Sequence, residues 1–151
     1  MRPPTRSDDA FSWNAGLLAP RQLDRPRTSF ASNELFLALL RAFRPHGGLL
    51  RHEEVERRAA RSARFEAPLH FAWESESWWP WFQFDRSGAA VNGVVLSVAE
   101  ELALDYDKLQ LCIWFASPNT WLGGLRPVEV LHDGATRVTA AARTDRYIAR
   151  G

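Results

Sequence analysis

The sequence KLQLCIWFA, residues 108–116, is apolar at nearly every position and decides the fold class. A helix that is apolar all round is usually the buried centre of a small bundle. Asp107 precedes it and is expected to be its N-cap, because a carboxylate can accept from the free N–H groups of a first helical turn. Pro118 is expected to end it, since proline lacks an N–H donor and disfavours helix in the preceding residue. The stretch therefore predicts a buried central helix.

The residues on both sides of this stretch predict further helices. Val91–Leu104 places apolar residues on one helical face, namely Val91, Val94, Val95, Val98 and Leu102. Pro127 stands where a proline opens a short helix, at its first position, and Gly134 closes that helix. Ala135–Ala149 is expected to be the last helix. Its inward residues are Val138, Ala141 and Ala142.

The beginning of the chain predicts an arm and two more helices. Residues 1–27 hold recurrent prolines among Arg and Asp with no lasting period of 3.6 or 2, which indicates an N-terminal arm. Asn33–Phe43 has an apolar stripe and follows Ser32, a good N-cap. His52–Arg64 is expected to be a second, short helix with its arginines mostly outward.

A β-hairpin is predicted between the two helical parts. The runs Pro68–Trp73 and Trp78–Asp85 alternate apolar and polar residues, as half-buried strands do. Because proline cannot donate to a sheet ladder, Pro80 places the second strand at an edge or bulge. Alternation puts Phe82 and Phe84 on one face, where we expect both rings in the core.

These elements define a mainly α protein, a small helical bundle with a short β-hairpin. A chain of 151 residues, 46% of them hydrophobic, can bury a core as one domain or two very small ones. We expect an N-terminal arm over residues 1–27, a helical region with the hairpin over 28–88, and a helical domain over 89–151.

Composition indicates a cytoplasmic protein with no membrane segment. No apolar run approaches the ~20 residues that span a bilayer, and the opening MRPPTRSDDA lacks the apolar stretch of a secretory signal. Cys112 is the one cysteine, so an internal disulfide framework is excluded.

The residue pattern argues against an enzyme, a metal site and a bound cofactor. The four histidines lie far apart, without the spacing of zinc ligands. Glu100 and Glu101 are consecutive on a helix and point in different directions, and Asp107 is needed as a cap. Cys112 lies in the most apolar stretch, where burial makes a thiol inert. Gly123-Gly124 lacks the residues of a phosphate-binding loop.

Two features leave nucleic-acid binding open. Residues 1–66 carry 12 Arg and 8 acidic residues, and an arginine stripe could contact DNA phosphates: Arg57, Arg58, Arg61 and Arg64. The order helix, short helix, hairpin is also that of a winged-helix unit. Glutamates interleave with the stripe, which favours a solvated face. The tryptophans of residues 73–84 could stack bases or supply core.

The C-terminal segment resembles a known family. Its pattern is Trp114-Phe115-x-x-Pro118-Asn119-x-x-Leu122-Gly123-Gly124-x-x-Pro127-x-x-x-Leu131-x-x-Gly134. This pattern, with Val138 and Ala141-Ala142 behind it, is similar to the toxin-binding domain of Xre/MbcA/ParS-type antitoxins. The lead-in Phe82-Gln83-Phe84-Asp85-x-x-Gly88 resembles members that lack a standard Xre repressor domain. The resemblance covers roughly residues 68–145 and is strongest over 111–142.

The resemblance implies a type II antitoxin that neutralises a RES-type, NAD-consuming toxin by occluding its active site. Members commonly oligomerise, so a homo-oligomer is also expected. Exposed Trp and Arg anchor protein interfaces, and the expected toxin-binding residues are Trp121, Leu122, Arg126, Arg143, Arg146, Tyr147 and Arg150. Two alternatives stay open: Trp121 could cap the core, and residues 144–151 could be a frayed end rather than a tail that reaches the toxin's NAD pocket. A DNA-binding regulator that uses the basic N-terminal half is the alternative function.

Overall fold

A three-stranded antiparallel sheet and seven α-helices make up residues 31–151, the part of the chain that the computed structural model describes. The expected arm over residues 1–27 lies outside these residues. The protein is mainly helical with a small sheet, as the sequence predicts. None of the helices in residues 31–151 is long and apolar enough to cross a membrane.

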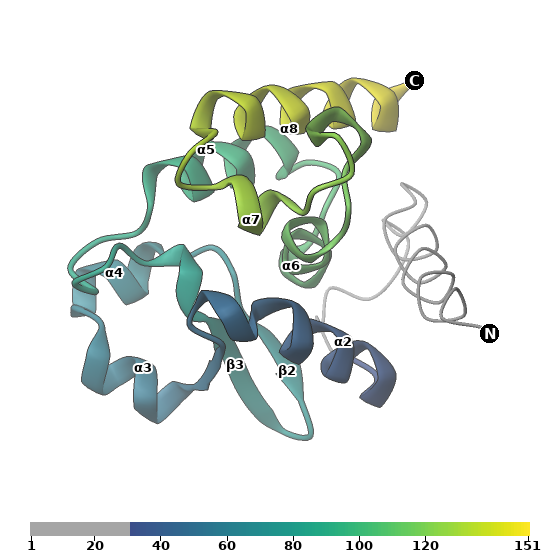
Figure 1. The fold of residues 1–151 in the computed structure, drawn as a ribbon. Coiled ribbons are helices and arrows are strands. Elements are labelled where there is room, and N and C mark those ends of the chain that lie inside the picture. Colours follow the sequence, from purple (N-terminus) through teal and green to yellow (C-terminus); the bar gives the residue numbers. More distant parts are fainter. Residues whose placement is uncertain (1–30) are drawn as a thin grey trace.

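The first part of the structure, residues 33–84, is called the N-terminal layer below. Its elements are α2 (Asn33–Phe43), η2 (Arg44–His46), β1 (Leu49–Arg51), α3 (His52–Arg58), α4 (Arg61–Glu66), β2 (Phe71–Trp73), β3 (Glu76–Pro80) and η3 (Trp81–Gln83). Helix α2 lies along the sheet, and α3 and α4 follow β1 at one end (Figure 1). The N-cap at Ser32 is confirmed: its hydroxyl accepts from the N–H of Leu35 at 3.2 Å.

The predicted single helix over His52–Arg64 is wrong, because the chain breaks between α3 and α4. Ala59 and Ala60 are extended, and the N–H of Ala60 donates to the carbonyl of Gly88 at 2.8 Å instead of continuing a helix. Gly88 has a φ of +80°, and a Cβ there would collide with the carbonyl of Arg58. The break therefore comes from a distant loop that takes the helical donor.

The hairpin is confirmed, but two of its details differ from the prediction. β3 ends at Pro80 and not at Asp85, and it is the central strand, since the order is β1-β3-β2. Pro80 is tolerated there because it is the last residue of the ladder, opposite Leu49. Phe82 and Phe84 are both buried as expected, although Trp81–Gln83 is a 3₁₀ turn and not a strand.

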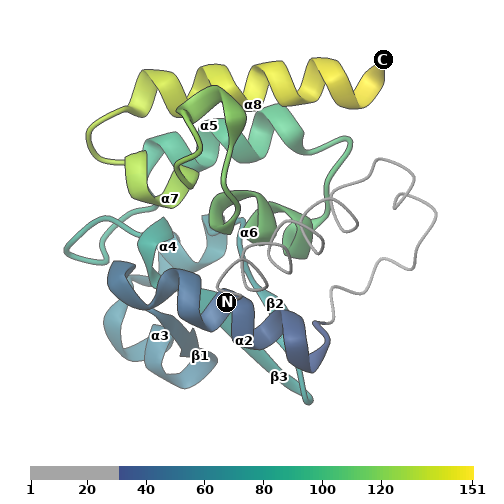
Figure 2. The ribbon, with the colours of Figure 1, turned by 45° about the vertical axis from the view of Figure 1, so that its right-hand side comes forward.

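The second part, residues 93–150, is called the C-terminal layer. Its elements are α5 (Gly93–Leu102), α6 (Lys108–Ala116), η4 (Thr120–Leu122), α7 (Pro127–Val130) and α8 (Ala135–Arg150). α5 and α8 lie side by side and run in the same direction, above α6 (Figures 1 and 2). The predicted central helix is confirmed: every residue of α6 after Lys108 is buried, and Asp107 and Gln110 form a capping box at its start.

Aromatic rings join the two layers through α6. Phe43 of α2 lies 5.0 Å from Phe82, Phe82 lies 5.1 Å from Phe115, and Phe115 meets Trp114 edge to face at 5.1 Å between ring centroids. These rings are all buried. The two layers therefore share one apolar core, with α6 in the middle.

Candidate functional site

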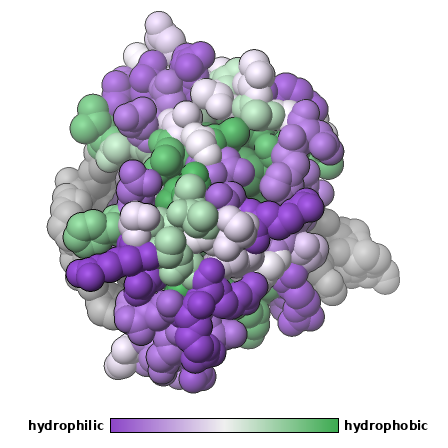
Figure 3. Space-filling model, turned by 90° about the vertical axis from the view of Figure 1, so that its left-hand side faces the viewer, coloured by the Kyte–Doolittle hydropathy of each residue, from purple (hydrophilic) through white to green (hydrophobic). Residues whose placement is uncertain are grey.

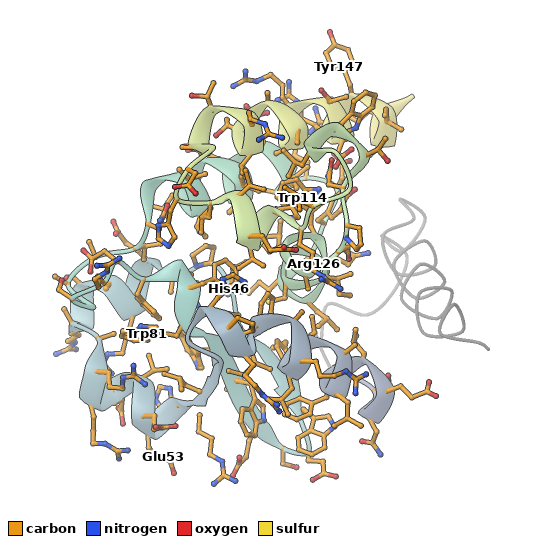
Figure 4. All side chains as sticks on the ribbon, in the orientation of Figure 1. His46, Glu53, Trp81, Trp114, Arg126 and Tyr147 are labelled. Carbon is orange, nitrogen blue, oxygen red and sulfur yellow. The ribbon has the colours of Figure 1, made fainter. Side chains whose placement is uncertain are left out.

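A cavity of about 190 Å³ opens where α6, η4 and α8 meet. Trp114 lies beneath α8 on that side of the molecule (Figure 4). The lining combines aromatic rings with a carboxylate and short polar side chains: Tyr106, Trp114, Ser117, Pro118, Asn119, Thr120, Trp121 and Asp145. Its volume is below the roughly 300–1,000 Å³ of sites for drug-sized ligands. The cavity therefore suits a single side-chain head group and not a dinucleotide.

The carboxylate of Asp145 is the centre of this site. Its Oδ2 accepts from Trp114 Nε1 at 2.7 Å and from Asn119 Nδ2 at 3.0 Å, and its Oδ1 accepts from Trp121 Nε1 at 3.1 Å. All of these donors are neutral. They satisfy acceptor positions of the carboxylate without placing a positive charge beside it.

Asn119 fixes the turn that brings Trp121 to Asp145. Its Oδ1 accepts from the N–H of Trp121 at 2.8 Å, and its carbonyl accepts from the N–H of Gly124 at 2.9 Å. Gly123 and Gly124 have φ values of +69° and +87°, a left-handed conformation that glycine adopts without strain. The glycine pair and Asn119 of the family pattern therefore shape this turn.

The two arginines that follow Asp145 on α8 pair with other carboxylates. Arg146 lies 2.7 Å from a carboxylate oxygen of Glu101 on α5, and Arg150 lies 3.0 Å from Asp105. No ion pair in residues 31–151 includes Asp145. Burial, and then the charges of Asp145 and Asp105, raises the pKa of Tyr106 to about 12. The site is therefore anionic.

The turn residues of the expected toxin-binding set have different environments. Trp121 is 52% exposed while its indole N–H binds Asp145, so it both packs on α8 and faces solvent. Leu122 is fully buried, so it cannot contact a partner, and that expectation is corrected. Arg126, between α6 and α7 in Figure 4, donates from Nε to the carbonyl of Ala116 at 2.8 Å and pairs with Glu129.

The C-terminal residues of that set lie on α8, which continues to Arg150. Arg143 and Arg146 pair with Glu101 at 3.2 and 2.7 Å, and Arg150 pairs with Asp105. Tyr147 is 74% exposed and points away from the protein (Figure 4). The segment is helical instead of an extended tail, and its arginines bind α5 and the turn that follows it.

The arginine stripe does not form one line. Arg57 and Arg58 belong to α3, whereas Arg61 and Arg64 belong to α4. Arg58 lies over the ring of Trp81 at 4.4 Å, and Arg64 pairs with Glu56 at 3.5 Å. In Figure 3, the lower part of the surface, over α3, is mostly hydrophilic, as a solvated face would be.

The tryptophan-rich run mainly supplies packing. The ring of Trp73 is stacked on Phe36 at 4.0 Å between centroids, and Trp79 is buried with His70 stacked on it at 4.5 Å. Trp78 meets Phe36 edge to face at 5.0 Å. These rings bind protein groups and do not form an open row for bases.

The nucleophile candidate Cys112 and three acid–base candidates, Glu101, Asp105 and Asp107, hold structural positions. Cys112 is fully buried, and burial raises the pKa of its thiol well above the ordinary value. Glu101 and Asp105 pair with arginines, and Asp107 caps α6. Within residues 31–151, no group of three or more His, Cys, Asp or Glu side chains is placed to hold a metal ion.

Sequence reasoning missed Asp145 and Tyr106. Asp145 is the one acidic residue of α8 and stands four positions after Ala141, which faces the core. That spacing places a carboxylate on the inward face of a helix, where an ionised group needs partners. This signal was present in the sequence, but the partners come from distant turns.

Comparison of the chain with protein-family models, with curated proteins and with solved structures finds no match.

Proposed function

We propose that this chain is an antitoxin that binds a cognate RES-type toxin through its C-terminal layer and occludes the toxin's active site. The resemblance of residues 111–142 to antitoxin toxin-binding domains supports this proposal. The single structural observation that carries it is the exposure of large apolar side chains on one layer.

Five of the seven exposed large hydrophobic residues of the described chain lie beyond residue 103. These five are Leu104, Trp121, Leu125, Tyr147 and Ile148. The other two are Leu37 and Phe65. The five belong to one layer, and Trp and Tyr are among the side chains most enriched as interface anchors. Trp121 is also pre-ordered by its turn, which lowers the entropy lost on binding.

The proposed mechanism is steric. Tyr147 and Ile148 project from the last turns of α8, so they can enter a cleft of the partner while the body of the protein covers its mouth. Arg143 and Arg146 attach α8 to Glu101 of α5, and Arg150 attaches it to Asp105 in the turn after α5, so these arginines act as positioning residues in this scheme. No chemical step by the antitoxin is required.

The test uses the full chain and the product of the neighbouring reading frame, which this proposal expects to be a RES-type toxin. The wild type should form a stable complex and suppress the toxin's NAD consumption. The double variant Trp121→Ala, Tyr147→Ala should suppress it at least about tenfold less well, as loss of two anchors predicts. The matched control, Leu37→Ala with Phe65→Ala, removes exposed apolar groups of the N-terminal layer and should inhibit like wild type. Failure of the wild type to bind that toxin overturns the proposal.

A second candidate function, DNA binding, is favoured by one observation. The order helix, strand, helix, helix, hairpin with strand order β1-β3-β2 is the topology of a winged-helix unit. Charge opposes it, since α3 and α4 together carry four arginines and four glutamates. Anisotropy of a labelled duplex from the gene's own upstream region distinguishes the two. Binding that weakens steeply between low and high salt, and further in Arg57→Gln, Arg61→Gln, supports this candidate; absence of binding removes it.

A further inference from the structure

The Asp145 site holds an anionic charge that the fold does not balance. Three neutral donors surround the carboxylate, and the two arginines that follow it on α8 are bound to Glu101 on α5 and to Asp105 in the turn after α5. Neither arginine is three or four positions from Asp145, the spacing that would bring the two side chains together on one helix. The arrangement keeps a negative charge at the mouth of a cavity.

The hydrogen-bond capacity of Asp145 leaves room for one more donor. A carboxylate has about four acceptor positions, two on each oxygen. Oδ2 accepts from both Trp114 and Asn119, whereas Oδ1 accepts only from Trp121. The open position is therefore on Oδ1, next to the half-exposed indole of Trp121.

We propose that this pocket binds the guanidinium group of an arginine side chain on a partner protein. A guanidinium can donate to Oδ1 in its plane while its face stacks on the indole of Trp121, two contacts that a compact ammonium makes less well together. Tyr106 and Trp114 complete an aromatic lining around the carboxylate. The cavity of about 190 Å³ has room for a head group and is smaller than the usual sites of drug-sized ligands.

This inference rests on the proposed antitoxin function for the identity of the partner, because the arginine would be supplied by the toxin. It adds a specific polar contact to the apolar one that Trp121 makes. The pocket lies on α6, η4 and α8, so an arginine held there would orient a partner across the C-terminal layer.

The first experiment titrates the ¹⁵N-labelled full chain with N-acetyl-arginine amide and follows the indole N–H signals of Trp114 and Trp121. Both signals should shift and saturate. N-acetyl-citrulline amide, the uncharged isostere, should leave them unmoved, and N-acetyl-lysine amide should bind more weakly. Equal shifts with the citrulline compound overturn the proposal. Tighter binding of free L-arginine than of the amide also overturns it, because the site would then serve a metabolite.

Variants test whether the Asp145 pocket, and not another part of the C-terminal layer, binds the arginine compound. Asp145→Asn should bind N-acetyl-arginine amide about tenfold more weakly or not at all, since it removes the charge. Asp133→Asn is the matched control: it neutralises an exposed carboxylate of the C-terminal layer that lies outside the pocket lining, and it should bind like wild type. If Asp145→Asn does not fold, Trp121→Ala tests the stacking face at an exposed position. Unchanged arginine binding in the folded variant overturns the proposal.

A toxin-binding measurement separates failure of the arginine pocket from failure of the proposed antitoxin function. If the chain binds the toxin but shows no response to N-acetyl-arginine amide, the arginine-pocket proposal is overturned and the antitoxin proposal is kept. If the response to N-acetyl-arginine amide saturates and depends on Asp145 but no toxin complex forms, the antitoxin proposal is overturned and the guanidinium site is kept. With both present, Asp145→Asn should weaken the toxin complex, and an unchanged complex overturns the toxin as the source of the arginine.

Discussion

The contacts within the N-terminal layer differ in kind from those within the C-terminal layer. In the N-terminal layer, rings stack on rings and cations lie on rings: Phe36 on Trp73, His70 on Trp79 and Arg58 on Trp81. In the C-terminal layer, the Asp145 carboxylate accepts from indole and amide donors, and Glu101 of α5 and Asp105 in the turn after it bind three arginines of α8. Both layers bury apolar side chains, but rings are held by stacking in the first, whereas directed polar contacts hold the half-exposed Trp121 and the arginines of α8 in the second.

This difference indicates where recognition can occur. In the N-terminal layer the rings contact one another, and the surface carries equal numbers of arginines and glutamates on α3 and α4. Directed contacts to Asp145 instead hold Trp121 in a fixed, half-exposed position beside a cavity. A rigid polar framework that presents an aromatic group is the arrangement that binding sites require.

The largest effect is expected where the layers meet, at Phe115. This ring is fully buried against Phe82 and Trp114. Phe115→Ala should lower the free energy of unfolding by about 3–5 kcal/mol, the usual cost of a truncated core phenylalanine. Urea unfolding followed by circular dichroism checks this. Phe65→Ala, at a ring that is 92% exposed, is the control and should change the free energy by less than about 0.5 kcal/mol. A small loss in Phe115→Ala would mean that the layers are stable independently.

Gln83 is the exception to the apolar character of the N-terminal layer. It is fully buried, its Oε1 accepts from the N–H of Leu69 at 2.9 Å, and its Nε2 donates to the carbonyls of Leu69 and Pro80 at 2.7 and 3.0 Å. Gln83→Ala should cost about 3 kcal/mol, because it leaves buried backbone groups without partners. Chemical denaturation measures the loss. Asn33→Ala, which removes an exposed bond to Trp73, should cost less than about 1 kcal/mol.

A smaller, pH-dependent effect is expected at His70, where the sheet meets α6. Burial, and then the charge of Lys108, lowers the pKa of His70 to about 4. The unfolded chain, with a pKa near 6.5, therefore binds more protons between these values. Stability should be highest above pH 6.5 and should decrease as the pH falls toward 4. Thermal unfolding at several pH values checks this, and His70→Phe, which keeps a ring over Trp79, should flatten that part of the profile. An equal slope in both proteins contradicts the assignment to His70.

The smallest effects compare ion pairs of the two layers. Glu101, with a side chain 18% exposed, pairs with two arginines, whereas Arg51 and Glu76 pair at 57% and 48% exposure. Glu101→Gln should cost about 1 kcal/mol and Arg51→Gln less than about 0.5 kcal/mol, since exposed pairs are weakened by solvent and side-chain entropy. Unfolding in low and high salt measures both. Equal costs would remove this contrast between the layers.

Several features of the fold follow from local sequence. The caps at Ser32 and Asp107, the apolar helix α6, the start of α7 at Pro127 and the inward face of α8 are confirmed because each depends on neighbouring residues. Local periodicity also identified Phe82 and Phe84 as core residues, although it assigned them to a strand.

The tertiary structure decided what depends on residues distant in the chain. The break between α3 and α4 requires Gly88, and the central place of β3 requires β1, a strand of three residues that is too short to show a period. The candidate site has the same origin: Asp145 receives its donors from residues 24 to 31 positions earlier. Sequence alone placed Trp121 in a turn with glycines behind it. Trp121 is half-exposed beside a carboxylate that has no ion pair only because α6, η4 and α8 pack together. This packing brings the indole and the carboxylate within hydrogen-bond distance.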